Sequence, residues 1–206
     1  MSSQSLINQL KETSYLGQVL EEIQLFWFEE QTRRHDFWNN IRDDQKGEFI
    51  NGEGIMYNSP VKLKHARASY SLLQKLIPYL DQYSTGLLGY EKMMMRLTRN
   101  DYEPDIVFWK NEKAKLFTKD QHIFPPADFV VEILSAHTEK IDRGIKMEDY
   151  AAHGIQEYWI VDPENKVLEQ YLLEGNSYKI HLKLQSGLVT SKVIDGFTLV
   201  VESLFD

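Results

Sequence analysis

The sequence predicts an α/β protein in which helices flank a central mixed sheet. Short runs rich in β-branched and aromatic residues recur in its second half, as in IVFW, FVVEIL and YWIV. Two longer segments before them carry apolar residues at helical spacing. Residues 129–162 have the order strand, helix, strand, which is typical of a right-handed crossover onto a sheet with parallel strands.

The N-terminal third begins with helix and continues into a hairpin. Residues 1–14 are polar and are expected to fray. Residues 16–41 have mostly helical apolar spacing and no Gly or Pro after Gly17, so they predict one long helix. The dipeptide Asn51-Gly52, within EFINGEGIMY, predicts two short strands joined by a tight turn.

Two further helices are indicated by capping residues. Ser59 and Pro60 are expected to open the first of them, as N-cap and first helical residue. Pro78 is expected to kink or end that helix. The second lies between strands, with Thr138 as the N-cap candidate and Gly154 as the C′ candidate.

Composition narrows the class of protein. The 206 residues carry 31 acidic and 23 Lys or Arg side chains, a net charge of −8, which counts against non-specific coating of DNA. The absence of cysteine excludes disulfides, thiol nucleophiles and thiolate metal sites. No signal peptide and no apolar run of about 18 residues is recognisable, so we expect a cytoplasmic protein without membrane contact.

Acidic residues inside predicted strands carry the chemistry. Glu132 stands in ADFVVEIL with two apolar neighbours on each side, where a carboxylate is costly unless it is paired, hydrogen-bonded or metal-bound. Asp105 leads directly into IVFW. Two such acids on neighbouring strands would make a site for a hard cation such as Mg²⁺. The alternative is that they cap strand ends or pair with Arg or Lys.

The predicted helix after Glu132 supplies a cation. Asp142, Lys146 and Tyr150 lie at successive i, i+4 positions and so share one stripe. Spacing alone favours a surface ion pair between Asp142 and Lys146. The other interpretation places Lys146 over the carboxylates, where it would orient a water or offset phosphate charge. No pair of histidines has zinc-binding spacing.

Several blocks of sequence, in order, resemble one known family. These blocks are GEFINGEGIMYNSP, EPDIVF, the segment from PADFVVEIL to VLEQY, and IDGFTLVVESLF. They resemble the Uma-two-type restriction endonucleases, a bacterial branch of the PD-(D/E)xK nuclease superfamily. The resemblance implies a restriction-endonuclease-like domain at residues 46–206, preceded by an N-terminal helical extension at residues 1–45.

The resemblance also assigns site residues. Asp105 takes the PD position and Glu132 the (D/E) position. Leu134 stands where the superfamily has its lysine, and Lys146 matches the position to which this branch has moved it. Glu53, in the NGE turn, matches an early acidic position and is expected to add a metal ligand, directly or through water. The backbone carbonyl of Ile133 is a further expected ligand.

The resulting expectation is a Mg²⁺-dependent DNA endonuclease that can also use Mn²⁺. Asp105 and Glu132 would hold the metal, while Lys146 would position or activate water. The alternative is a non-cleaving module that keeps the nuclease fold to bind nucleic acid or a protein partner. The aromatic LFWF stretch near residue 26 suggests packing onto the core or a homodimer.

Overall fold

A six-stranded mixed sheet forms the centre of the computed structural model, which describes residues 3–42 and 44–206. In spatial order its strands are β11 (Ser177–Leu184), β10 (Val167–Glu174), β9 (Glu157–Asp162), β8 (Phe129–Ile133), β6 (Ile106–Lys110) and β3 (Gly86–Tyr90). Strands β8 and β9 are parallel, whereas the other neighbouring pairs are antiparallel. The predicted mixed sheet and the crossover are therefore confirmed.

Each face of this sheet buries its own apolar cluster. Phe129, Val131 and Ile133 of β8 point into the cluster under helix α3 (Leu63–Tyr83). Val130 points to the opposite cluster, which lies under the helix that follows β8. Because side chains alternate along a strand, Glu132 shares the face of Val130. The sequence pattern thus places one carboxylate inside a buried face.

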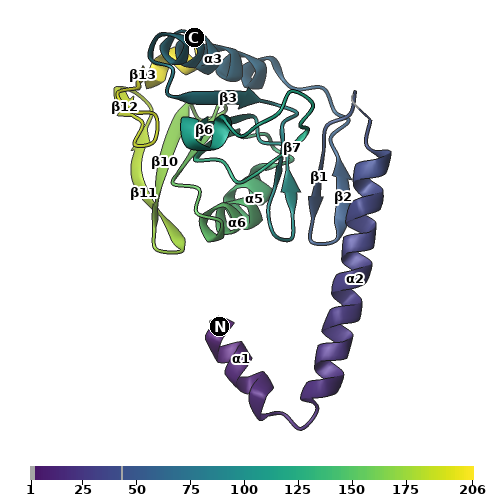
Figure 1. Cartoon of the computed structure of the whole chain (residues 1–206). Coiled ribbons are helices and arrows are strands. Elements are labelled where there is room, and N and C mark those ends of the chain that lie inside the picture. The colour runs from purple at the N-terminus through teal and green to yellow at the C-terminus, as the bar shows by residue number, and fades with distance from the viewer. Residues whose placement is uncertain (1–2, 43) are drawn as a thin grey trace.

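A second, five-stranded sheet stands beside the first one (Figure 1). Its order is β2 (Glu53–Met56), β1 (Gly47–Ile50), β5 (Asp101–Tyr102), β4 (Met94–Arg96) and β7 (Ile123–Phe124). Strands β1 and β2 are joined at Asn51 and Gly52, whose φ angles are 51° and 89°. Two successive residues with positive φ are what a tight hairpin turn needs. The predicted hairpin is confirmed.

Helix α3 departs from the sequence prediction at its start, and it does not end at Pro78, which was one of the two outcomes predicted there. It begins at Leu63, not at Ser59 or Pro60, and it continues through Pro78 to Tyr83. Val61 and Leu63 are 64% and 74% exposed, so a helical turn there would bury nothing. Around Pro78, by contrast, α3 buries Leu72, Leu76 and Leu80. Burying three leucines contributes more than the roughly 3 kcal/mol that an internal proline costs.

The segment after β8 is a helix of mixed type. It consists of α5 (Glu139–Ile141), a π-helical turn η1 (Asp142–Lys146) and α6 (Met147–Ala152). Thr138 precedes it as predicted but makes no side-chain capping bond to it. Gly154 follows with φ 75°, the left-handed conformation expected at C′. A π turn widens the helix locally, a feature common at functional sites.

Two helices form an arm at the N-terminus (Figure 1). The predicted long helix is α2 (Leu16–Asn40), and its C-terminal half is anchored by Arg34, which binds both carboxylate oxygens of buried Asp101 at 2.6 Å. The expectation of a frayed start is wrong, because residues 3–12 form helix α1 (Ser3–Glu12). Its amphipathic spacing of Leu6, Ile7 and Leu10 explains the helix.

The chain ends in a small hairpin and a short helical turn. Strands β12 (Leu188–Thr190) and β13 (Thr198–Val200) pair antiparallel, and the 3₁₀ turn η2 (Val201–Leu204) packs near α3. Helix α4 (Asn111–Ala114) is a single turn after β6. Among the described residues, none of the helices is both long and apolar enough to cross a bilayer.

Candidate active site

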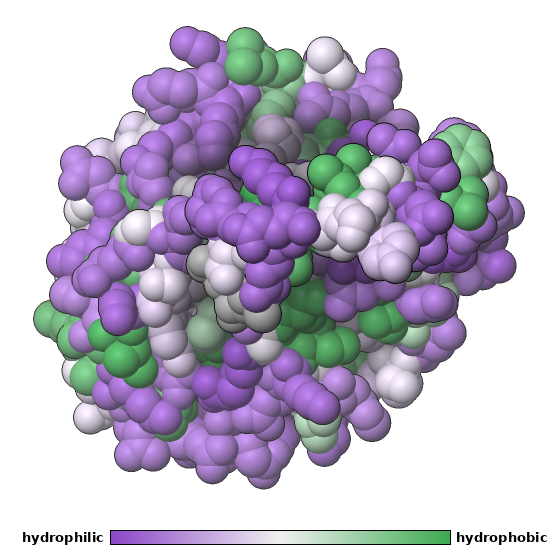
Figure 2. Space-filling view, turned by 90° about the horizontal axis from the view of Figure 1, so that it is seen from below, coloured by the Kyte–Doolittle hydropathy of each residue, from purple (hydrophilic) through white to green (hydrophobic). Residues whose placement is uncertain are grey.

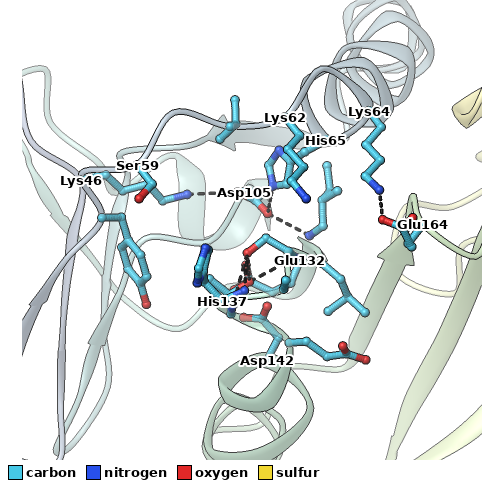
Figure 3. Close-up of a pocket in the computed structure, with 18 of the residues that line it drawn as sticks. Lys46, Ser59, Lys62, Lys64, His65, Asp105, Glu132, His137, Asp142 and Glu164 are labelled. Carbon is cyan, nitrogen blue, oxygen red and sulfur yellow. Dashed lines mark hydrogen bonds and ion pairs between the residues drawn. The ribbon is translucent and has the colours of Figure 1, made fainter.

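A cavity of about 520 Å³ opens where the β1–β2 hairpin, the start of α3 and the helix after β8 meet (Figure 3). Asp105, Glu132, Ile133 and Lys146 all line it. Three of these four predicted site residues are charged, and they come from three elements far apart in the chain. The structure therefore brings the acids and the lysine into one enclosure.

Strand pairing places Asp105 beside Glu132. Ile106 of β6 pairs with Val131 of β8 in antiparallel register, so the next pair of positions is Asp105 and Glu132. Directly opposed residues on antiparallel strands project from the same face. The backbone N–H of Ile133 donates a 2.8 Å hydrogen bond to Asp105 Oδ2, which ties the two strand ends together.

Asp105 is ionised and surrounded by donors. Lys46 Nζ lies 3.0 Å from its Oδ1, and His65 Nε2 lies 3.4 Å from its Oδ2. Burial opposes the charge, but His65, Lys46 and the Ile133 N–H outweigh it and hold the pKa of Asp105 well below its ordinary value. The same carboxylate, together with Glu132, raises the pKa of Lys46 against the effect of burial.

Lys146 lies in the centre of a buried group of carboxylates. Its Nζ is 2.9 Å from Glu48 Oε1, 3.0 Å from Glu132 Oε1 and 3.1 Å from Asp142 Oδ1. Tyr150, one turn further along the helix, donates to Glu132 Oε1 at 2.8 Å. The Asp142–Lys146 pair is thus buried and part of the site, so the interpretation as a surface ion pair is wrong.

The group holds three acids and one lysine, and this imbalance shifts their protonation. Burial raises the pKa of Glu132 to about 8, and the neighbouring acids Asp142, Asp105 and Glu48 add to the shift. Burial disfavours the ammonium of Lys146, but the carboxylates outweigh it and hold the pKa of Lys146 well above its ordinary value. At neutral pH Lys146 is therefore protonated and Glu132 largely keeps its proton as well, while the carboxylate of Asp105 stays charged.

The hairpin acid at the site differs from the one predicted. Glu53 is exposed on β2 and does not line the cavity. Glu48, on β1, is fully buried, reaches Lys146 and accepts the backbone N–H of Glu103. The sequence held a signal for it, because Glu48 leads directly into the apolar residues Phe49 and Ile50 of a short strand, as Asp105 leads into IVFW.

Two further basic residues lie at the site. From its place near the start of the predicted helix, His65 could reach a site, although the sequence favours a structural or solvated role for it, and Lys46 carries no such indication. Lys46 lies directly before β1, and His65 lies in the first turn of α3. Both contact Asp105, although they are separated from it by 59 and 40 positions in sequence. Neither has a local pattern that would single it out, because only the tertiary fold sets the hairpin and α3 against β6.

The donors at the site fit a hard divalent cation. Within residues 3–42 and 44–206, no three or more His, Asp and Glu side chains are already arranged to hold a metal ion. Asp105 and Glu132 nevertheless stand at opposed positions at the ends of neighbouring strands, and Lys46 Nζ lies 3.0 Å from Asp105 Oδ1. Carboxylates, a backbone carbonyl such as that of Ile133, and waters are the ligands that Mg²⁺ prefers.

Comparisons with known proteins identify the fold and the family of this chain. A crystal structure of a "putative nuclease belonging to DUF820" from Anabaena variabilis ATCC 29413 matches with a TM-score of 0.70 and 17% sequence identity. The match covers 82% of this chain and 94% of that one, and it shows a shared fold. No curated protein matches. Residues 29–202 match the Uma2 family, described as "Putative restriction endonuclease". The chain belongs to this Uma2 restriction-endonuclease family.

Proposed function

We propose that this chain is a Mg²⁺-dependent endonuclease that hydrolyses phosphodiester bonds in DNA. The observation that carries the proposal is the position of Lys146, whose Nζ lies 3.0 Å from Glu132 in the cavity that also holds Asp105. Two strand acids and one lysine are the set that the family resemblance assigned. They converge even though the lysine comes from the following helix and not from β8.

Each residue has a distinct role in this proposal. Asp105 and Glu132 would hold Mg²⁺ or Mn²⁺, with the Ile133 carbonyl beside them. When bound, the metal supplies polarisation of the phosphoryl oxygen and an acidified water. Lys146, held by Glu48 and Asp142, orients the attacking water or offsets charge that develops on phosphate. Tyr150 fixes the carboxylate of Glu132 through its hydroxyl.

A basic rim supports a polyanionic substrate. Lys46, Lys62, Lys64 and His65 all line the cavity, and Figure 3 shows them around Asp105. Lys64 forms an ion pair with Glu164 on the opposite wall. On a chain with a net charge of −8, this local basic rim is where a phosphate backbone would approach. We further propose that the protein works on DNA in the cytoplasm.

Cleavage of supercoiled plasmid with Mg²⁺ or Mn²⁺ tests the proposal. We expect nicking by the wild type, and a loss of at least about 100-fold in the Asp105→Asn and Glu132→Gln variants. The matched control is Glu53→Gln, an exposed hairpin acid outside the cavity, which should keep wild-type activity. Circular dichroism of each variant checks that the fold is intact. Equal metal-dependent nicking by all variants would refute the site.

A non-cleaving binding module is the second candidate. It is favoured by the Lys46–Asp105 ion pair, which occupies one carboxylate that a metal would need. Thermal unfolding with and without Mg²⁺ separates the two candidates, because a bound metal stabilises the folded state by mass action. A well-folded wild type with neither a thermal shift nor nicking would favour the binding module.

A further inference from the structure

The N-terminal arm, defined here as residues 3–28, has no fully buried apolar side chain among those that the structure describes. Helix α1 and the first half of α2 lie outside the globular part of the chain (Figure 1). The arm carries nine large apolar side chains that are 40–70% exposed, namely Leu6, Ile7, Tyr15, Leu20, Ile23, Leu25, Phe26, Trp27 and Phe28. Figure 2, viewed from the side of the arm, shows apolar patches among hydrophilic residues on this face.

The apolar stripe of α2 continues the face that packs on the core. Leu20, Ile23 and Trp27 stand at helical spacing with Glu30 and Arg34, which are the two buried residues of this helix. One continuous stripe therefore meets the core at its C-terminal end and meets solvent at its N-terminal end. Exposure of apolar side chains to water is unfavourable, so the stripe indicates a protein partner that covers it.

The exposed area has the size of a stable interface. Nine side chains of about 200 Å² each, roughly half exposed, present on the order of 900 Å² of surface. The largest apolar patch of an ordinary monomer is about 300–600 Å². A standard protein–protein interface buries about 800 Å² on each partner. By helical position Leu25 and Phe28 project away from the stripe of Leu20, Ile23 and Trp27, so an interface of that size would have to enclose the arm and not cover one face of it.

The charge of the arm decides between the classes of partner. Residues 3–28 contain Glu12, Glu21 and Glu22 but only Lys11 as a basic residue. A helix that binds an anionic membrane surface or nucleic acid carries Lys and Arg on its polar face instead. Glu21 and Glu22 also lie, by helical position, on the side opposite to the stripe of Leu20, Ile23 and Trp27. The stripe itself can therefore pack against another apolar surface.

We infer that the arm pairs with the arm of a second copy of this chain. Helix α1 turns back from α2 at the bend near residues 13–15, so each copy offers a helix and an adjoining apolar stripe (Figure 1). A two-fold pairing brings the same patch of both copies together, so the arm of one copy would meet the arm of the other. The inference gives the expected homodimer a defined surface. It is independent of the nuclease proposal, because mass alone measures it.

Light scattering coupled to size exclusion tests the inference on the full chain. We expect a dimer at about 10 μM and above. The Leu20→Glu/Ile23→Glu double variant should be monomeric at the same concentration, since it puts charges on the stripe without touching a buried residue. The matched control is Leu116→Glu/Leu188→Glu, which alters two leucines that are 73% and 64% exposed outside the arm. This control should remain dimeric.

Thermal unfolding and circular dichroism establish that the globular part of each variant is folded. A wild-type chain that is monomeric up to about 100 μM would overturn the inference. So would an arm variant that is folded and still dimeric, or a control variant that loses the dimer equally. A monomeric wild type that co-sediments with anionic vesicles would identify a lipid surface as the partner and would also overturn it.

Discussion

Glu48 gives a sharp test of how the buried cluster is held together. Its carboxylate accepts from Lys146 Nζ at 2.9 Å, from the backbone N–H of Glu103 at 3.0 Å and from the Tyr57 hydroxyl at 2.7 Å. We consider two substitutions, Glu48→Gln and Glu48→Ala. The first removes the charge but keeps an acceptor oxygen, whereas the second removes both.

The two variants should differ widely in stability. Lys146 keeps Glu132 and Asp142 as partners in either variant. Glu48→Gln should therefore lower the free energy of unfolding by only about 1 kcal/mol. Glu48→Ala strands the buried N–H of Glu103, at about 1–3 kcal/mol, and leaves a cavity. Its total cost should be about 2–4 kcal/mol.

Urea unfolding at pH 7, followed by tryptophan fluorescence, measures both values. Glu53→Ala serves as the control from the same hairpin and should stay within about 0.5 kcal/mol of wild type, because Glu53 is exposed. If Glu48→Gln costs as much as Glu48→Ala, charge and not hydrogen bonding governs this position, and the reasoning fails. It also fails if neither variant is destabilised.

Three other outcomes follow from buried groups. Burial raises the pKa of Glu103 to about 7 from an ordinary value of 4.5, so its favourable contribution is present below pH 4.5 and is lost as pH rises through 7. Urea midpoints should therefore fall between pH 5 and 8, and Glu103→Gln should reduce that fall by about 2–3 kcal/mol in unfolding free energy; an unchanged slope would contradict the prediction. Arg34→Ala should cost about 3–5 kcal/mol in the same unfolding assay, because the fully buried Asp101 loses its bidentate partner and keeps only the Trp38 N–H at 2.9 Å and Arg96 at 3.9 Å. Leu72→Ala, at a fully buried position in α3, should cost about 2–5 kcal/mol by thermal unfolding, whereas a cost below 1 kcal/mol would mean that α3 packs loosely.

Local patterns in the sequence determined most of the elements. Alternation of β-branched residues marked β8 and β9, and Asn51-Gly52 marked the hairpin, because both signals depend on neighbouring residues only. The same local reasoning failed at Pro60, and at Pro78 it could not decide that α3 continues. Whether a helix tolerates proline depends on what its other residues bury, and the partners of α3 are distant in sequence.

The sequence also identified the acids that break the apolar pattern. Asp105 and Glu132 stood out because a carboxylate inside an apolar strand needs a compensating partner. The sequence could not show which residue is that partner. By helical spacing alone, Lys146 could equally well have been exposed to solvent. Only the packing of the π turn against β1 and β8 buries it among three carboxylates.

Only the tertiary structure shows the remaining residues of the site, Glu48, Lys46 and His65. The hairpin acid at the site is Glu48 and not Glu53, because β1 pairs with β5 and is buried, whereas Glu53 on β2 is exposed. Lys46 and His65 reached Asp105 because the hairpin and α3 fold over the same strand end. A sequence can show which residues must be buried or paired, since that is a property of each strand. The choice of partner is set by long-range packing, which has no local signature.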